Sequence, residues 1–143
     1  MLGVGIAPAL AACGATTAAS CTSIGCDSEV AVTDLTQVAG EYGPQPVTAT
    51  LCVDDDCQTD QVVFTGSDAT PTVEKVLGEN SPPAKTDVGV TFRLTRDGRT
   101  LLDTSTTTQL TRSQPNGKDC GPICYQSLFT IEGGKLVPRG PSS

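Results

Sequence analysis

The sequence contains no histidine and no tryptophan, and its only methionine is Met1. The absence of histidine removes the most common general base, the Ser-His-Asp and Cys-His nucleophile arrangements, and the most common ligand of zinc or copper. The absence of any further methionine also excludes thioether copper sites. We therefore expect a protein that is not an enzyme and that holds no metal or cofactor.

Basic residues are few as well. Nine Lys and Arg stand against sixteen Asp and Glu, which gives a net charge of −7. An acidic surface repels phosphate backbones, so we expect no nucleic-acid partner. Solubility alone is enough to explain the charge.

Large apolar side chains are scarce, with three Phe and two Tyr in 143 residues. This length suits a single domain, whose core must consist mainly of Val, Leu, Ile and Ala. Abundant Thr, Val, Gly and Pro favour strands and turns over helices. A core with so few aromatic residues gains from covalent cross-links, and seven cysteines are present to supply them.

The amino-terminal segment is typical of an export signal. Residues 2–12 are apolar or small and too few to span a bilayer as a helix. The sequence Leu-Ala-Ala-Cys at 10–13 resembles the bacterial lipobox, which implies cleavage before Cys13 and a diacylglycerol on its sulfur. We expect a signal peptide at 1–12 and a lipid-anchored flexible tether at 13–20, which together place the protein on the outer face of the cell membrane.

An alternative is ordinary signal-peptidase cleavage after Ala11, because Ala9 and Ala11 satisfy the small-x-small rule. The protein would then be secreted with seven cysteines, one of them unpaired. Lipidation of Cys13 instead leaves an even number for disulfides, and this parity favours the lipobox.

Residues 88–95 show the clearest strand pattern, with Val88, Val90, Phe92 and Leu94 on one face. Asp97-Gly98 supplies a hairpin turn, and residues 100–112 form the returning strand. Five further strands are expected at 29–33, 46–53, 61–65, 72–77 and 125–132. About seven strands separated by Gly, Pro and Asp predict an all-β fold, an immunoglobulin-like antiparallel β-sandwich stapled by disulfides.

The predicted domain covers residues 21–133. No stretch of eleven residues holds a helical period. The sequence Leu-Val-Pro-Arg-Gly at 136–140 resembles a thrombin cleavage site, so residues 134–143 are expected to be a disordered tail or a cloning remnant outside the fold.

Six cysteines follow Cys13, and sequence alone allows fifteen pairings among them. They are Cys21, Cys26, Cys52, Cys57, Cys120 and Cys124. Cys52 and Cys57 flank a tight turn, so we pair them. Each bridge between the first and last clusters would stabilise the fold by roughly 2 to 3 kcal/mol more than a local bridge, because the closed loops are long. Local bridges form more easily, so both pairings stay open and we expect at least one cross-link. Such a cross-link needs the first and last strands to lie side by side and parallel.

Three motifs contain residues that could bind a metal, carry out redox chemistry or recognise a partner. Cys120 and Cys124 are separated by three residues, where a thioredoxin-type motif has two, so a structural disulfide is favoured. The contiguous residues 54–56, all Asp, lack the alternate spacing of a calcium loop and favour a solvated turn. The loop that precedes Cys120 is a candidate for protein recognition, with an ordinary connecting turn as its alternative. Its residues are Gln114, Pro115, Asn116 and Gly117.

The motifs Cys-Thr-Ser-Ile-Gly-Cys-Asp-Ser at 21–28, Gln-Pro-Asn-Gly at 114–117 and Cys-Gly-Pro-Ile-Cys-Tyr-Gln at 120–126 resemble small secreted or lipid-anchored proteins of actinobacteria. The resemblance covers residues 21–131 and implies the location and the fold, with no activity attached.

Three functional hypotheses follow. The first is a non-enzymatic cell-envelope lipoprotein that binds another protein or an envelope polymer. The second is a secreted inhibitor of an extracellular protease, with residues 115–124 entering the enzyme cleft. The third is a hydrolase that uses carboxylates alone, which would need two converging Asp or Glu side chains in a cleft.

Overall fold

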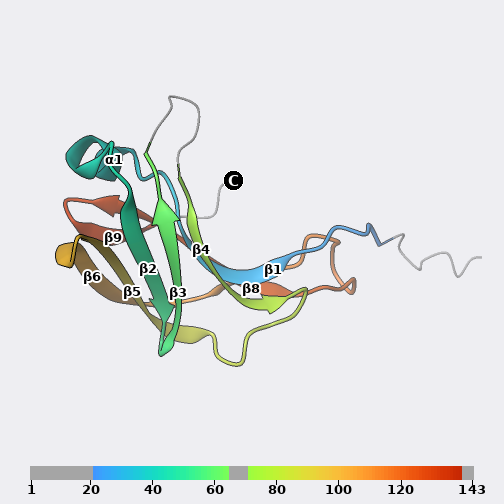
Figure 1. The fold of residues 1–143 in the computed structure, drawn as a ribbon. Helices are drawn as coiled ribbons and strands as arrows, with labels where there is room; N and C mark the ends of the chain where they lie inside the picture. The colour runs from blue at the N-terminus through green and yellow to red at the C-terminus, as the bar shows by residue number, and fades with distance from the viewer. Residues whose placement is uncertain (1–20, 65–70, 140–143) are drawn as a thin grey trace, which may run out of the picture.

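The computed structural model describes residues 21–64 and 71–139. The predicted signal peptide, Cys13 and the predicted tether lie outside the described residues. Within the described part, nine strands and one short helix occur (Figure 1). In chain order they are β1 (Asp27–Val32), α1 (Thr36–Tyr42), β2 (Val47–Val53), β3 (Asp56–Val62), β4 (Val73–Glu79), β5 (Asp87–Arg96), β6 (Arg99–Gln109), β7 (Thr111–Ser113), β8 (Cys124–Glu132) and β9 (Lys135–Arg139).

The strands form two sheets that pack face to face as a β-sandwich, which confirms the predicted all-β class. One sheet has the order β4-β1-β8-β7, with β9 also paired to β8, and the other has the order β3-β2-β5-β6. All strand pairs are antiparallel except β1 and β8, which run parallel, with Val30 opposite Ser127. Membership of the immunoglobulin-like class stays a prediction. No helix in the described residues is long and apolar enough to cross a membrane.

Aliphatic side chains fill the space between the sheets, as the scarcity of aromatics predicts. Val and Leu make up most of the buried cluster, and Phe92 and Phe129 are its only aromatic members among the described residues. The alternation predicted for β5 is confirmed, because Val88, Val90 and Leu94 are buried with Phe92. No buried side-chain nitrogen or oxygen of the described residues lacks a hydrogen-bond partner.

The predicted Asp97-Gly98 hairpin is confirmed between β5 and β6. Both residues have positive φ, 51° and 76°, which two-residue hairpin turns of this kind require. The returning strand does not continue to residue 112 as one element, however. The chain leaves the second sheet after Gln109, passes through the buried Leu110 and joins the first sheet as β7.

The expectation that the fold ends at residue 133 is wrong. Gly133 and Gly134 have φ values of 57° and 74° and form the tight turn into β9, which pairs with β8. Leu136 of β9 is only 7% exposed and belongs to the core. Residues 135–139 are therefore part of the domain, because their apolar side chain fills space between the sheets.

The strand predicted at 61–65 is also misplaced, since β3 begins at Asp56, directly after the turn. Its side chains are exposed apart from Val62, because β3 is an edge strand whose inner side is largely uncovered. The helix α1 was not predicted. Its only fully buried residue is Val38, which packs on the core beside Leu35.

Candidate functional site

Two long-range disulfides close one end of the sandwich. Cys21 is bonded to Cys120 and Cys26 to Cys124, with Cα separations of 5.6 and 6.1 Å. These bonds confirm the predicted cross-pairing, and the parallel pairing of β1 with β8 supplies the geometry for it. Figure 1 shows the amino-terminal arm beside the loop that leads into β8, at the right-hand end of the molecule. We call residues 21–26 and 114–124 the clamp.

Asn116 is the centre of the hydrogen bonding in the clamp. Its Oδ1 accepts from the backbone nitrogen of Ile24 at 3.0 Å and from the Thr22 hydroxyl at 2.5 Å. Its Nδ2 donates to the carbonyl oxygens of Ile24 and Gly121, both at 2.8 Å. The loop that contains Asn116 is the candidate for protein recognition, with a connecting turn as its alternative. The Asn116 side chain holds two segments of the same chain together, while Pro115 and Gly117 of this loop are exposed.

The arm is held from its other side by Asn80. Asn80 Oδ1 accepts from the backbone nitrogen of Cys26 at 3.0 Å, and its own backbone nitrogen donates to the Cys26 carbonyl at 2.9 Å. A Cβ at Gly25 would lie 2.8 Å from Asn80 Oδ1, so only glycine permits this approach. Ile24, between the two asparagines, keeps 54% of its surface exposed.

The third disulfide, between Cys52 and Cys57, is confirmed across the β2–β3 hairpin. The acidic turn beside it serves the fold. Asp54 Oδ1 accepts from the backbone nitrogen of Gly89 at 2.9 Å, and Asp54 Oδ2 pairs with Lys85 at 3.4 Å. Asp56 pairs with Lys75 at 3.0 Å and so links the edges of the two sheets. No group of three metal-ligating side chains occurs in the described residues.

Two carboxyl groups have shifted pKa values, for different reasons. The hydrogen bond from Gly89 lowers the pKa of Asp54, and Lys85 adds to this effect. Burial raises the pKa of Glu29 in β1, and the carboxylates of Glu74 and Asp27 raise it further. Neither carboxyl group lines the two cavities described below.

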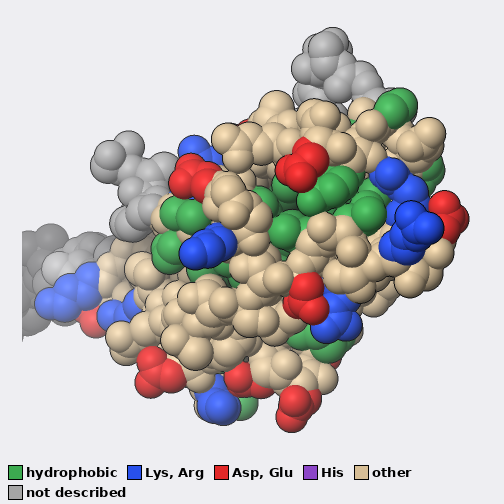
Figure 2. Space-filling view, turned by 90° about the vertical axis from the view of Figure 1, so that its left-hand side faces the viewer, with side chains coloured by type: hydrophobic (Ala, Val, Ile, Leu, Met, Phe, Trp, Pro, Cys, Tyr) green, Lys and Arg blue, Asp and Glu red, His purple; other side chains and the backbone are tan. Residues whose placement is uncertain are grey.

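The opposite end of the sandwich has a hollow of about 500 Å³. Its apolar lining comes from three segments far apart in sequence: Val38 of α1, Leu102 of β6 and Ile131 of β8. Gln37 and Glu41 lie at its rim, and the turn Gly133-Gly134 after β8 forms one wall. Figure 2 looks onto this end and shows hydrophobic side chains gathered in its middle, with charged side chains around them.

Polar contacts hold α1 against the second sheet beside this hollow. The Tyr42 hydroxyl donates to the Leu101 carbonyl at 3.0 Å. Burial raises the pKa of Tyr42, with Glu41 adding to the shift, so the hydroxyl stays a donor. The Arg96 guanidinium donates to the carbonyl oxygens of Tyr42 and Gln45, which fixes the chain after the helix. Sequence reasoning missed this site because its lining exists only once the sheets have packed.

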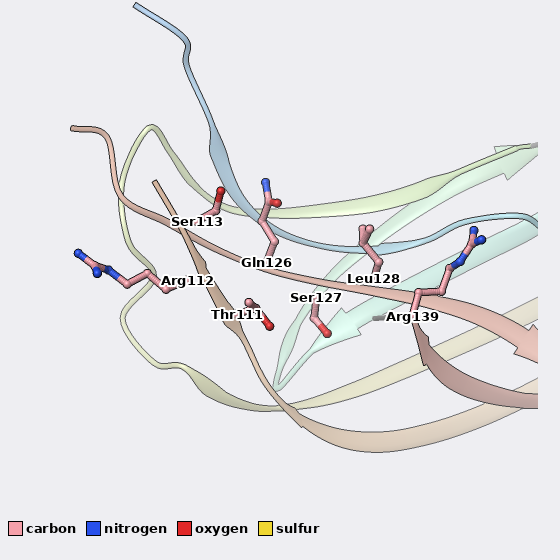
Figure 3. Close-up of a pocket in the computed structure, with 7 residues that line it drawn as sticks. All are labelled: Thr111, Arg112, Ser113, Gln126, Ser127, Leu128 and Arg139. Carbon is pink, nitrogen blue, oxygen red and sulfur yellow. The ribbon is translucent and has the colours of Figure 1, made fainter. Parts of the chain in front are cut away.

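A smaller cavity of about 310 Å³ lies where β7 and β9 end against β8. Arg112 and Arg139 both line it, which suggests an anion site at first sight. Figure 3 shows that the two side chains extend toward opposite sides and away from one another. The two guanidinium groups therefore do not converge on one ligand. The hollow and the clamp are the better candidates.

No protein family, curated protein or solved structure matches this chain.

Proposed function

We propose that this chain is a non-enzymatic, lipid-anchored module of the bacterial cell envelope that binds another protein. The lipobox-like sequence ending at Cys13 supports the anchor. The three disulfides are consistent with an extracellular or otherwise oxidising environment.

The observation that carries the binding role is the open hollow beside α1, which is lined by aliphatic side chains and by Gln37, Glu41 and Tyr42. Its volume of about 500 Å³ is large enough for a bulky side chain of a partner. Apolar anchors that fill pockets, surrounded by a polar rim, supply most of the free energy of many protein interfaces.

Catalysis receives little support from the same site. The sequence has no histidine, and Glu41 is the only carboxylate that lines the hollow. The carboxylate-only hydrolase needs two converging acids, one as acid and one as base or nucleophile. We therefore propose a binding module in place of a hydrolase.

The protease-inhibitor alternative is not favoured by any contact at the clamp. An inhibitor loop that binds in a cleft like a substrate offers free peptide groups to the enzyme, as an added strand does. Here the carbonyl groups of Cys120, Gly121 and Ile24 accept hydrogen bonds from Gln114 and Asn116.

The test begins with mass spectrometry of the natively expressed protein under non-reducing conditions, which reports acylation of Cys13. The acylated protein is then used as bait in envelope extract, and each captured protein is purified and titrated. Gln37→Trp places a large side chain on the rim of the hollow, so we expect at least a tenfold weaker affinity.

Thr59→Trp, at an exposed position of strand β3, is the matched control and should bind as the wild type does. Equal affinity of the Gln37→Trp variant and the wild type for every purified partner would exclude the hollow as the binding site. The binding role would be refuted by two results together. The acylated protein would capture no protein that the unacylated Cys13→Ser variant does not also capture, and no captured protein would bind in titration.

A further inference from the structure

Ile24 is the most exposed large hydrophobic side chain of the described residues. Its exposed fraction is 54%, compared with 47% for Val63 and 38% for Val76. It lies in the short arm between Cys21 and Cys26, whose disulfides hold it at the tip of the clamp. An apolar side chain fixed in this way is presented to whatever lies beyond that end of the domain.

The peptide groups of Ile24 and Cys26 are hydrogen bonded within the protein. Asn116 satisfies both the nitrogen and the carbonyl oxygen of Ile24, and Asn80 does the same for Cys26. A peptide group that enters an apolar phase without a partner carries a large penalty. Because these groups keep their partners, Ile24 can leave water at little polar cost.

The arm also carries no charge. Residues 21–26 contain no acidic or basic side chain, although the whole chain has a net charge of −7. In the adjoining loop Lys118 and Asp119 are exposed side by side and offset one another.

The covalent chain fixes which end stands near the bilayer. Eight peptide units join Cys13 to Cys21, and even fully extended they span at most about 29 Å. The eleven residues of β6 run between the two ends of the domain over a similar length, roughly 36 Å. If Cys13 is acylated, the clamp is the end held close to the membrane.

We propose that the clamp rests on the phospholipid surface, with Ile24 inserted among the headgroups, and that the hollow beside α1 faces away from the membrane. This inference depends on the acylation of Cys13 that forms part of the proposed function. One aliphatic side chain does not retain a free protein at a bilayer. It biases the orientation of a tethered domain by roughly tenfold.

The absence of tryptophan from the chain makes the test direct. Ile24→Trp and Val76→Trp each introduce a single indole at an exposed aliphatic position, the second on β4. Both acylated full-length variants are placed on phosphatidylcholine vesicles with and without bromine in the acyl chains. We expect at least twofold quenching by bromine and a blue-shifted emission for Ile24→Trp, and neither for Val76→Trp.

Mass spectrometry of the same samples separates the two ways of failing. A chain without an acyl group on Cys13 overturns both the anchor and this contact. With Cys13 acylated, equal quenching of the two variants, or quenching of neither, overturns the contact alone. A blue shift of Ile24→Trp without bromine quenching assigns the residue to contact with a second copy of the chain, which also overturns the membrane contact.

Discussion

At the residue scale, the amide of Asn116 organises a region without regular secondary structure. Three of its four contacts join Asn116 to Thr22 and Ile24, more than ninety positions away, and the fourth joins it to Gly121. The two disulfides close around them. An amide suits this position because it both donates and accepts. The clamp is therefore specified by one residue type as well as by its cysteines.

We expect Asn116→Ala to lower the free energy of unfolding by about 1–3 kcal/mol, because it leaves several backbone groups without partners. Asn116→Asp keeps the acceptor for the Ile24 nitrogen but turns a carboxylate oxygen toward two carbonyl groups. It should be at least as destabilising above pH 5. Urea unfolding followed by circular dichroism measures both, and an Asn116→Asp variant as stable as the wild type would show that the donated bonds contribute nothing.

Asp54 makes stability depend on pH in a defined direction. Its pKa in the folded protein is lowered, chiefly by the hydrogen bond from Gly89, so the folded state favours the carboxylate. The stabilisation is complete above the ordinary pKa, near 3.8, and is lost as the pH falls through the lower folded value. We expect Asp54→Asn to flatten the decline in stability below about pH 4.

The measurement is the urea midpoint between pH 2 and 7. Asp55→Asn, which changes the adjacent residue of the turn, is the control and should retain the decline of the wild type. If the stability of Asp54→Asn declines with falling pH as that of this control does, the hydrogen bond from Gly89 to Asp54 is not the cause of the decline.

At the element scale, sequence patterns succeeded where one face of a strand is buried and failed where none is. The alternation of β5 and the Asp97-Gly98 turn identified the central hairpin. Cysteine spacing identified the Cys52–Cys57 bridge and favoured a cross-link between the first and last cysteine clusters, but it did not fix which cysteines pair there. The edge strand β3 has no such alternation, because almost all of its side chains are exposed. A seven-residue helix is likewise too short for its period to stand out.

β9 was missed for another reason. Gly133-Gly134 is a two-residue hairpin signal, and Leu136 and Val137 follow it. The likeness of residues 136–140 to a protease site outweighed that signal.

Of the two candidate sites, the clamp could be located from its cysteines. The hollow could not, because its lining depends on how the sheets separate at one end.

The contribution of β9 can be measured. We expect Leu136→Ala to cost about 2–4 kcal/mol, since a buried side chain of the core is truncated. Lys135→Ala, on the exposed first residue of the same strand, should change stability by less than about 0.5 kcal/mol. Equal effects of the two variants in urea unfolding would mean that β9 is not packed on the core.

The two long disulfides should act jointly. With one of them intact, the other closes a further ring of only about ten residues and contributes roughly 2.5–3 kcal/mol. With both removed, the long loop opens as well, and the loss should be roughly 7 kcal/mol, more than the sum of the single losses. Pairwise Cys→Ala variants compared in denaturant test this, and strictly additive losses would contradict the ring argument.

At the scale of the whole molecule, the sandwich has two unlike ends, joined by β6 and β8 along its length. One end is closed by covalent bonds and asparagine contacts, and the other keeps an open apolar hollow. The proposed anchor is next to the closed end in sequence. A tethered module of this form would present its open end to partners outside the membrane.

The charge of −7 should keep the unacylated protein away from membranes. We expect the Cys13→Ser variant not to float with vesicles that contain phosphatidylserine, at either low or physiological salt. The acylated protein should float under both conditions. Flotation of the Cys13→Ser variant at low salt would indicate a basic surface that the charge balance does not predict.

The parallel pairing of β1 with β8, locked by two disulfides, determines how the domain carries a mechanical load. A pull on the chain before Cys21 does not peel β1 from its neighbours one hydrogen bond at a time. The force passes through the sulfur bridges into the start of β8, a central strand, and is shared across the sheet. If the chain is anchored through Cys13 as proposed, a pull on the anchor enters the fold through these two disulfides.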